Sequence, residues 1–180
     1  MRHGRHPHLY FDSNVILDAI LDRNEISKGV LARAATHKWK CTTSRFTFAE
    51  ILDTLQKEHQ KKLSRPITVR QLNRIYDNLN DLVERDYSHI EFEKPSQPEF
   101  WDHVEWIAGM SSVRARDAIH CATAYGDLSD LIVTRDRPFL AASERVPIRL
   151  RVPISLPRNL DLMLVDIGFI VDEHGQAVRT

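Results

Sequence analysis

The sequence predicts an α/β fold, a three-layer α/β/α sandwich whose central sheet is mainly parallel. Short apolar runs such as 9–11 and 131–134 have the length and composition of buried strands. Longer amphipathic stretches lie between such runs, and strands that alternate with helices pair in parallel through right-handed crossovers. With 180 residues, 42% of them hydrophobic, the chain is long enough to bury one core, and we expect one domain.

The expected elements follow from the spacing of apolar residues and from residues that start or stop a helix. Strands are predicted at 9–11, 39–43, 89–92 and 131–134. Helices are predicted at 14–21, 27–37, 44–65, 68–84, 98–108 and 115–125. Ser27 is the predicted cap of the second helix, Ser44 opens the third, and Pro66 requires the third helix to stop before it.

The chain is predicted to divide into a main domain over residues 1–144 and a C-terminal extension over residues 145–180. Within the extension, residues 148–152 alternate apolar and arginine side chains, the pattern of a half-exposed edge strand. Residues 160–170 are apolar enough to add a strand or to pack on a partner, and the last ten residues are expected to fray. We therefore expect the extension to pack on the main domain or on a partner.

Composition and charge exclude several classes of protein. Lys plus Arg equals Asp plus Glu at 25 each, so a polyanion would have to bind a local patch. Cys41 and Cys121 lack metal-ligand spacing and fall in apolar segments, which indicates reduced core thiols. No apolar run is long enough to cross a bilayer, and the first residues lack a signal-peptide pattern. We therefore expect a soluble, cytoplasmic protein with no membrane partner.

Four acidic residues lie where an α/β fold places carboxylates at the edge of its sheet. Asp12 follows the first strand and Asp136 follows the fourth, and the carboxyl ends of parallel strands are where such sheets hold their sites. Glu50 and Asp117 lie in helical patterns and project from helices. Carboxylates that converge repel one another until a cation binds. The four acids therefore predict a metal site.

The type of ligand predicts the type of metal and of reaction. Carboxylate oxygens around an open cavity suit Mg²⁺ or Mn²⁺ better than His or Cys ligands would. Such a cation polarises a phosphodiester, activates the attacking water and stabilises the leaving oxygen, as in two-metal phosphoryl hydrolysis. The predicted chemistry is therefore hydrolysis of a phosphodiester.

Each acid also has a simpler interpretation. Asp12 or Asp136 alone is typical of a helix cap, and Asp117 precedes an apolar helix as a partner of the helix dipole. Glu50 competes with Asp53, which lies three residues further along nearly the same helical face, and either can belong to a solvated surface. The presence of all four acids favours the metal site over these separate explanations.

Three more charged side chains near the acids have their own interpretations. His120 is interpreted as a packed or hydrogen-bonded core histidine, with a ligand role as the alternative. Asp18 and Asp22 are interpreted as part of a solvated helix face.

Arginines flank two of the four acids. They are Arg114, Arg116, Arg135 and Arg137. Guanidinium groups at these places can hold phosphates bidentately, which predicts substrate binding. The alternative for each is an ion pair with a neighbouring acid.

The segments around the acids resemble the motifs of the PIN-domain nucleases, especially the VapC-type toxin ribonucleases of toxin–antitoxin pairs. The resemblance covers roughly residues 8–140, through the segments 9–17, 44–51, 116–124 and 132–139. It implies a PIN-like nuclease domain in which the catalytic Mg²⁺ or Mn²⁺ ligands are Asp12, Glu50, Asp117 and Asp136. It also implies that Asn14 and Thr134 are supporting polar groups.

The resemblance further implies a metal-dependent endoribonuclease that hydrolyses RNA phosphodiester bonds, and a toxin of a type II pair as its more specific form. Single-stranded or loop RNA is the implied substrate, and an antitoxin protein and a homodimer are the implied partners. The alternative is a catalytically weak PIN-fold module that binds RNA or a protein. A phosphohydrolase with an aspartyl-phosphate needs a second aspartate where the sequence has Asn14, and no glycine-rich loop indicates a nucleotide-binding enzyme.

Overall fold

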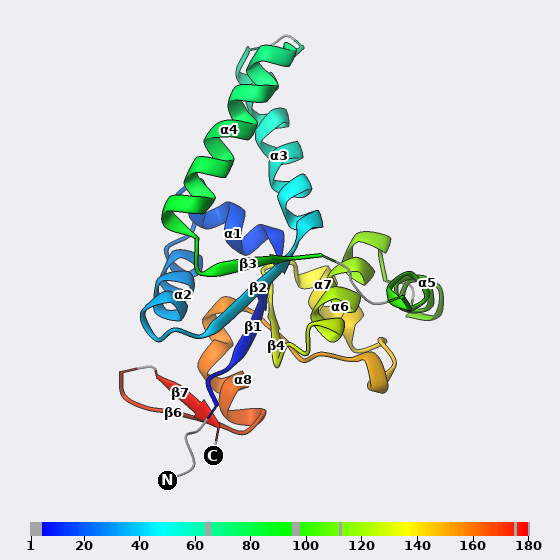
Figure 1. The fold of residues 1–180 in the computed structure, drawn as a ribbon. Helices are drawn as coiled ribbons and strands as arrows, with labels where there is room; N and C mark the ends of the chain where they lie inside the picture. Colours follow the sequence, from blue (N-terminus) through cyan, green and yellow to red (C-terminus); the bar gives the residue numbers. More distant parts are fainter. Residues whose placement is uncertain (1–4, 64–65, 95–97, 112, 175, 180) are drawn as a thin grey trace.

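The computed structural model describes residues 5–63, 66–94, 98–111, 113–174 and 176–179 (Figure 1). The strands are β1 (His8–Phe11), β2 (Lys40–Ser44), β3 (Ile90–Glu93), β4 (Leu131–Val133), β5 (Ile154–Ser155), β6 (Phe169–Val171) and β7 (Ala177–Arg179). The α-helices are α1 (Ser13–Ile20), α2 (Glu25–Thr36), α3 (Arg45–Leu63), α4 (Val69–Asp86), α5 (Phe100–Ser111), α6 (Ala115–Gly126), α7 (Arg137–Ser143) and α8 (Leu160–Asp166). Two short 3-10 helices are η1 (Ile148–Leu150) and η2 (Pro157–Asn159). Every element predicted up to residue 134 is present, with ends displaced by a few residues at most.

Five parallel strands form the central sheet in the order β3-β2-β1-β4-β5. The chain runs outward from β1 through β2 to β3, and then crosses to the other side of β1 to add β4 and β5. The strand order therefore reverses between β1 and β4, where open α/β sheets form a crevice at the carboxyl ends of their strands. The predicted parallel sheet is confirmed, and Asp12 and Asp136 follow the two strands that border this crevice.

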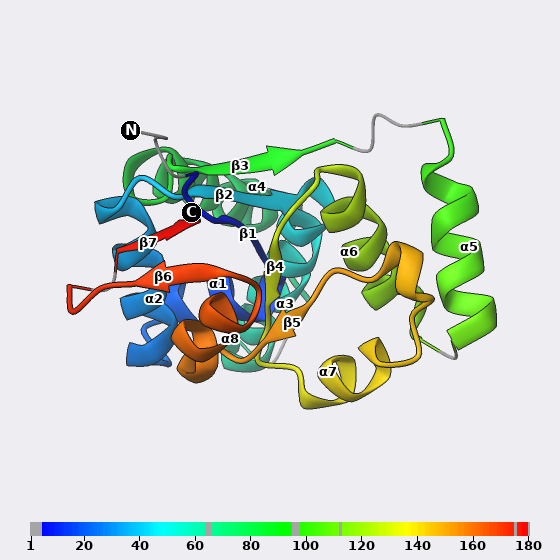
Figure 2. The ribbon, with the colours of Figure 1, turned by 90° about the horizontal axis from the view of Figure 1, so that it is seen from below.

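Helices cover both faces of the sheet and give the predicted three layers (Figures 1 and 2). Neighbouring residues of β1 point to opposite faces, so Leu9 and Phe11 join one buried cluster and Tyr10 joins the other. Helices α1, α2, α3, α4 and α8 contribute to the first cluster, and α5, α6 and α7 contribute to the second. Strands that are buried on both faces have continuous apolar sequences, which is why their positions could be predicted.

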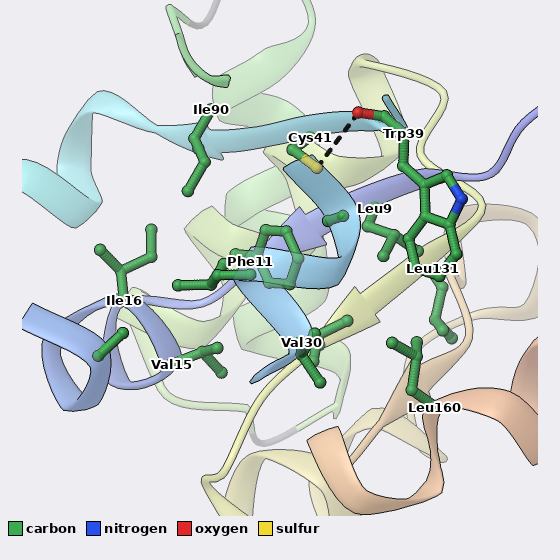
Figure 3. Close-up of a cluster of buried hydrophobic side chains, with 14 of the residues drawn as sticks. Leu9, Phe11, Val15, Ile16, Val30, Trp39, Cys41, Ile90, Leu131 and Leu160 are labelled. Atoms are coloured by element: carbon green, nitrogen blue, oxygen red, sulfur yellow. Dashed lines mark hydrogen bonds between the residues drawn. The ribbon is translucent and has the colours of Figure 1, made fainter. Parts of the chain in front are cut away.

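The first cluster surrounds β1, with Leu9 and Phe11 fully buried (Figure 3). Cys41 on β2 belongs to this cluster, and its Sγ donates to the Trp39 carbonyl at 3.4 Å. Burial raises the pKa of the Cys41 thiol to about 12, and that of Cys121 in the second cluster also to about 12. Both thiols are free and buried, as predicted, and neither ionises near neutral pH.

Helices α3 and α4 form a pair that projects from the sheet (Figure 1). Ser44 Oγ accepts from Thr47 N at 3.2 Å at the start of α3, which confirms its predicted role. Thr68 begins α4 with a capping box, since its Oγ1 accepts from Gln71 N and Gln71 Oε1 accepts from Thr68 N. Within the described ranges, neither these two helices nor any other combines the length and apolar character needed to cross a bilayer.

The second helix starts two residues before its predicted position. Helix α2 begins at Glu25, and its cap is Asn24, whose Oδ1 accepts from Ser27 N at 3.0 Å. The prediction that Ser27 caps this helix is therefore wrong. Asparagine caps a helix as well as serine does, and here the asparagine comes first along the chain.

The predicted edge strand at residues 148–152 is also wrong. Its first part is the 3-10 helix η1, in which Leu150 N donates to the Pro147 carbonyl at 2.8 Å. Arg151 then directs its guanidinium back onto the carbonyls of Glu144 and Val146. Prolines at both ends of the segment lack the N–H donors of a strand ladder, which favours this compact turn. The residues that follow supply an edge strand instead, β5, which pairs in parallel with β4.

The end of the chain forms a hairpin, so the prediction that it frays is wrong for the described residues. Strands β6 and β7 pair antiparallel, and Phe169 and Ala177 are buried in the first cluster. Gly168 connects α8 to β6 with a φ of 93°, a left-handed conformation that glycine adopts without strain. Arg5 bridges to Arg179, so the two ends of the described chain lie side by side (Figure 1). The domain boundary after residue 144 stays a prediction.

Candidate metal centre

The four acidic residues singled out in the sequence line one pocket of about 400 Å³. Asp12 follows β1, Glu50 lies in the second turn of α3, Asp117 lies in the first turn of α6, and Asp136 precedes α7. Asp12 and Asp117 are almost fully buried. Carboxylates that are far apart in the sequence therefore meet at the crevice where the strand order reverses.

Asp12 is held in place by hydrogen bonds from Thr134 and Asn14. Thr134 Oγ1 donates to Asp12 Oδ2 at 2.6 Å, and Asn14 Nδ2 donates to the same oxygen at 2.5 Å. Asp136 N in turn donates to Thr134 Oγ1 at 3.0 Å, so this hydroxyl connects the ends of β1 and β4. Asp12 occupies the cap position of α1, but its side chain accepts no capping hydrogen bond, which removes the capping interpretation.

Asp12 and Glu50 meet at the imidazole of His120 in α6. His120 Nε2 lies 2.9 Å from Glu50 Oε2 and 3.4 Å from Asp12 Oδ1. On its other side, His120 Nδ1 lies 2.7 Å from the Tyr10 hydroxyl, which accepts a hydrogen bond from Ser44 N. The prediction of a buried, hydrogen-bonded histidine is confirmed. The alternative interpretation of His120 as a metal ligand also has support. Ligand atoms of Asp12, Glu50 and His120 lie within 4.8 Å of one another, near enough to hold one metal ion.

The charges of these side chains depend on one another. Burial lowers the pKa of His120, but the neighbouring tyrosine and the two carboxylates outweigh it and raise this pKa well above its ordinary value. Burial raises the pKa of Glu50, but the hydrogen bond and the charge of His120 outweigh it and hold this pKa below its ordinary value. A protonated imidazole therefore supplies positive charge between the two carboxylates, as a bound cation would.

Asp117 and Asp136 are paired with arginines. Arg114 Nε donates to Asp117 Oδ2 at 2.6 Å, and its Nη2 donates to Asp136 Oδ2 at 2.5 Å. Arg116 Nε lies 3.3 Å from Asp117 Oδ1, and its Nη2 lies 3.2 Å from Asp136 Oδ2. The side chains of Arg114 and Arg116 are 47% and 50% exposed. The ion-pair interpretation of these two arginines is confirmed.

The two carboxylates of this pair differ in their affinity for protons. Burial raises the pKa of Asp117 above its ordinary value, and the neighbouring arginines offset this only in part. Burial also opposes ionisation of Asp136, but hydrogen bonds from Arg114 and from Phe139 N outweigh it and lower this pKa. Phe139 N donates to Asp136 Oδ1 at 3.1 Å, so Asp136 caps α7 with one oxygen and directs the other toward the arginines.

The other two flanking arginines have different surroundings. Arg135 forms an ion pair with Asp18, whose side chain is only 13% exposed. The solvated-face interpretation of Asp18 is therefore wrong, because α1 packs where the chain leaves β4. Asp22 is exposed, as predicted. Arg137 forms no ion pair with any described residue and lines a second, smaller pocket.

Glu50 and Asp53 both line the acidic pocket, but their contacts differ. The side chain of Glu50 is 17% exposed and contacts His120, whereas that of Asp53 is 56% exposed and pairs with Lys57 at 2.6 Å. The contacts therefore favour Glu50 as the acid that α3 contributes to the cluster.

Asp18 and His120 line the pocket, although a solvated helix face and the core were their first interpretations, and Tyr10, which does not line it, contacts His120. Two of them follow from helical spacing, because His120 lies three residues after Asp117 and Asp18 lies four residues after Asn14. Side chains at these spacings share a helix face. Tyr10 gives no such indication, since an aromatic residue in a buried strand is typical of a core.

A family model described as PIN domain matches residues 9–144. The chain belongs to the PIN domain family. The matched range starts in β1, ends just after α7, and contains all four acids of the pocket. No curated protein matches the chain.

Three solved structures are similar to this PIN domain protein. The crystal structure of PAE2754 from Pyrobaculum aerophilum has a TM-score of 0.51 and 18% identity, covering 89% of this chain and 96% of that chain. FitAcB from Neisseria gonorrhoeae has a TM-score of 0.49 and 18% identity, covering 83% of this chain and 98% of that chain. FitAB bound to an IR36 DNA fragment has a TM-score of 0.46 and 19% identity, covering 83% and 94%. At such identities the likeness to PAE2754 concerns the fold alone.

Proposed function

We propose that this PIN domain protein is an endoribonuclease that hydrolyses RNA phosphodiester bonds with Mg²⁺ or Mn²⁺. The proposal depends on one observation, the convergence of four carboxylates from four elements on one pocket. Membership in the PIN domain family supports a nuclease, and the resemblance of the motifs to those of toxin ribonucleases supports RNA as the substrate. The proposed metal ligands are Asp12, Glu50, Asp117 and Asp136.

The chemistry of the pocket fits a hard divalent cation. Carboxylate oxygens are the ligands that Mg²⁺ and Mn²⁺ prefer, and oxygens of Asp12 and Glu50 lie within 4.8 Å of one another. Each acid of the pocket already contacts a positive or hydrogen-bond-donating side chain, as expected where negative charge is concentrated. A divalent cation held there supplies Lewis-acid stabilisation of the phosphodiester and lowers the pKa of the attacking water.

Side chains in the pocket and beside it have supporting roles in this proposal. Asn14 and Thr134 fix the orientation of the Asp12 carboxylate through the hydrogen bonds to its Oδ2. Arg114 and Arg116 are long and half exposed, so they can turn from the acids to phosphate oxygens once the acids hold a cation. The substrate-binding role predicted for these arginines therefore requires an exchange of partners.

Cleavage of a mixed pool of single-stranded RNA by the purified protein tests the proposal. With Mn²⁺ or Mg²⁺ we expect cuts at preferred positions, identified by sequencing the new ends, and EDTA or Asp12→Asn should abolish them. Asp53→Asn is the matched control, because Asp53 lines the same pocket but pairs with Lys57, and it should cleave at close to the wild-type rate. Cuts that persist in Asp12→Asn, or equal cutting of a DNA pool, would contradict the assignment.

A catalytically weak PIN-fold module that binds RNA or a protein is the second candidate. The observation that favours it is the pairing of Asp117 and Asp136 with two arginines, which satisfies these acids without a cation. Such a module would show no thermal stabilisation by Mn²⁺ and would cleave no RNA pool. Stabilisation by Mn²⁺ that disappears in Asp12→Asn would exclude it.

We further infer, from the resemblance of the motifs, a toxin of a type II toxin–antitoxin pair that acts as a homodimer and binds a cognate antitoxin. Growth arrest on expression of the wild type but not of Asp12→Asn would support the toxin role, and equal growth of the two would remove it. Light scattering of the purified protein tests the homodimer. The cytoplasm is the proposed location, in keeping with the free, buried thiols of Cys41 and Cys121.

A further inference from the structure

A second pocket, of about 210 Å³, has a charge opposite to that of the acidic pocket. Arg135, Arg137 and Arg158 line it, and none of the described residues in its lining is acidic. Arg135 lines both pockets, so the two adjoin at this residue. Arg158 belongs to η2, beyond the range matched by the PIN model, so the C-terminal part of the chain completes this basic pocket.

The arginines of the basic pocket are less engaged than those that hold the acids. Arg135 pairs with Asp18 through Nη1. Arg137 and Arg158 are exposed, and neither forms an ion pair within the part of the chain that the structure describes. Guanidinium groups that share a pocket repel one another, and an anion between them relieves the repulsion. The pocket therefore suits a ligand with negative charge.

The rest of the lining indicates that this ligand is more than a free anion. Ile26, Leu156 and Pro157 provide apolar surface beside the arginines, and Ile26 is 51% exposed. A nucleotide has a sugar and a base that can cover such surface, in addition to a phosphate for the guanidinium groups. An inorganic phosphate would leave the apolar residues uncovered. The lining therefore favours a nucleotide unit of a strand.

The whole protein has no excess of positive charge, so any attraction of a polyanion has to come from a local surface such as this basic pocket. The formal net charge is +0, and the acidic pocket by itself repels a polyanion, so binding of nucleic acid requires a basic surface close to the acids. We propose that Arg135, Arg137 and Arg158 form a subsite for a backbone phosphate of single-stranded RNA, next to the phosphate that is cut. This inference rests on the proposed ribonuclease function and names how the same site holds its substrate.

Binding of a fluorescein-labelled single-stranded RNA, measured by anisotropy in EDTA, tests the subsite without requiring cleavage. The double variant Arg137→Gln/Arg158→Gln should bind about tenfold more weakly, because charge-assisted hydrogen bonds to the phosphate are lost. If the two arginines hold one phosphate, the slope of log Kd against log salt concentration should decrease by about 0.7.

Arg70→Gln/Arg74→Gln is the matched control for this charge change. Both arginines lie on α4, are exposed, and form no ion pair with a described residue. The control should keep wild-type affinity for the RNA, and both double variants should unfold at the wild-type temperature. An equal loss in the control would mean that general charge determines binding, and would overturn the subsite.

Neutral methylphosphonate linkages, introduced one at a time along the RNA, locate the phosphate. In the wild type, neutralising one particular internal linkage should weaken RNA binding. Neutralising the same linkage should not change RNA binding by Arg137→Gln/Arg158→Gln. Equal affinity of the wild type and this variant, or no single sensitive linkage, would overturn the subsite. Arginine-dependent binding by a wild type that cleaves no RNA with Mn²⁺ would contradict the nuclease alone and support the subsite.

Discussion

The four acids of the pocket and their basic partners form two halves, which neutralise their carboxylates in different ways. The histidine half contains Asp12, Glu50 and His120, and the arginine half contains Asp117, Asp136, Arg114 and Arg116. The base of the histidine half has a side chain only 2% exposed, whereas the two bases of the arginine half are 47% and 50% exposed. The first base is fixed by the core, and the other two can turn into solvent.

Because His120 is buried and the two arginines are half exposed, a cation has to displace different groups in the two halves. In the histidine half, the competitor is a proton on His120, since the imidazole has no room to leave. In the arginine half, the competitors are two flexible side chains that can exchange an acid for a phosphate. We therefore expect the histidine half to determine whether metal binds, and the arginine half to adjust the affinity.

The largest expected effect is that of Asp12→Asn. It should lower the rate of RNA cleavage by more than about 100-fold. Altering only the hydrogen-bond partners of a metal ligand lowers metal affinity or activity by about 10–100-fold, and this variant alters a ligand itself. Rates from single-turnover cleavage with Mn²⁺ measure the effect. A wild-type rate in this variant would place the metal outside the histidine half, and would contradict the claim that this half determines whether metal binds.

His120→Gln should destabilise the protein strongly when no metal is added. The variant leaves Asp12 and Glu50 without their positive neighbour, and removal of one partner of a buried charge pair costs about 3 kcal/mol. Urea unfolding with and without Mn²⁺ measures this, and Mn²⁺ should recover more stability in the variant than in the wild type. His37→Gln is a control that leaves the acids unchanged. Identical unfolding of His120→Gln and the wild type would mean that the imidazole carries no charge.

Thr134→Val tests the hydroxyl that orients Asp12. Loss of its hydrogen bond to Asp12 Oδ2 should weaken Mn²⁺ binding by about 10–100-fold, measured by calorimetry. Thr54→Val is the matched control, because Thr54 lines the acidic pocket but donates to the Glu50 carbonyl of its own helix and not to Asp12. Equal Mn²⁺ affinities in the two valine variants would rule out a special role for Thr134.

Replacement of the arginines should have a small effect of opposite sign. Arg114→Gln and Arg116→Gln should each strengthen Mn²⁺ binding by about fivefold or less, because exposed ion pairs contribute roughly 0–1 kcal/mol. The free energy of unfolding without metal should change by no more than this. Weaker Mn²⁺ binding in either variant would mean that the arginines organise the acids for the cation instead of competing with it.

The smallest expected effect is on the pH dependence of unfolding without metal. Ionisation of Asp117 opposes folding, because its pKa is raised, so its effect on stability becomes unfavourable as the pH rises through that pKa. Ionisation of Glu50 favours folding, because its pKa is lowered, and this stability is lost as the pH falls through that pKa. Asp117→Asn should therefore gain a small amount of stability over the wild type at neutral pH but not at acid pH. A constant difference across the pH range would contradict the raised pKa.

The sequence was sufficient to predict the parts of the fold that depend on local periodicity and on strand ends. Strands β1 and β4 are buried on both faces, and the positions of Asp12 and Asp136 after them follow from the parallel sheet. The acids on α3 and α6 also reach the predicted pocket, although their metal-binding role stays a prediction.

The features that could not be predicted depend on contacts between distant segments. Phe169 and Ala177 are buried only because the hairpin packs on the first cluster, which no local pattern indicates. Asp18 looked like a surface acid because its partner, Arg135, is more than a hundred residues away. The charge of His120 likewise depends on burial among acids from two other elements.

The most direct test is a crystal structure of the protein grown with Mn²⁺ and recorded at the manganese absorption edge. We predict an anomalous peak about 2.1 Å from carboxylate oxygens of Asp12 and Glu50, with Arg114 and Arg116 turned away from their acids. No peak at saturating Mn²⁺, with both arginines still on Asp117 and Asp136, would contradict the claim that these carboxylates form a metal centre.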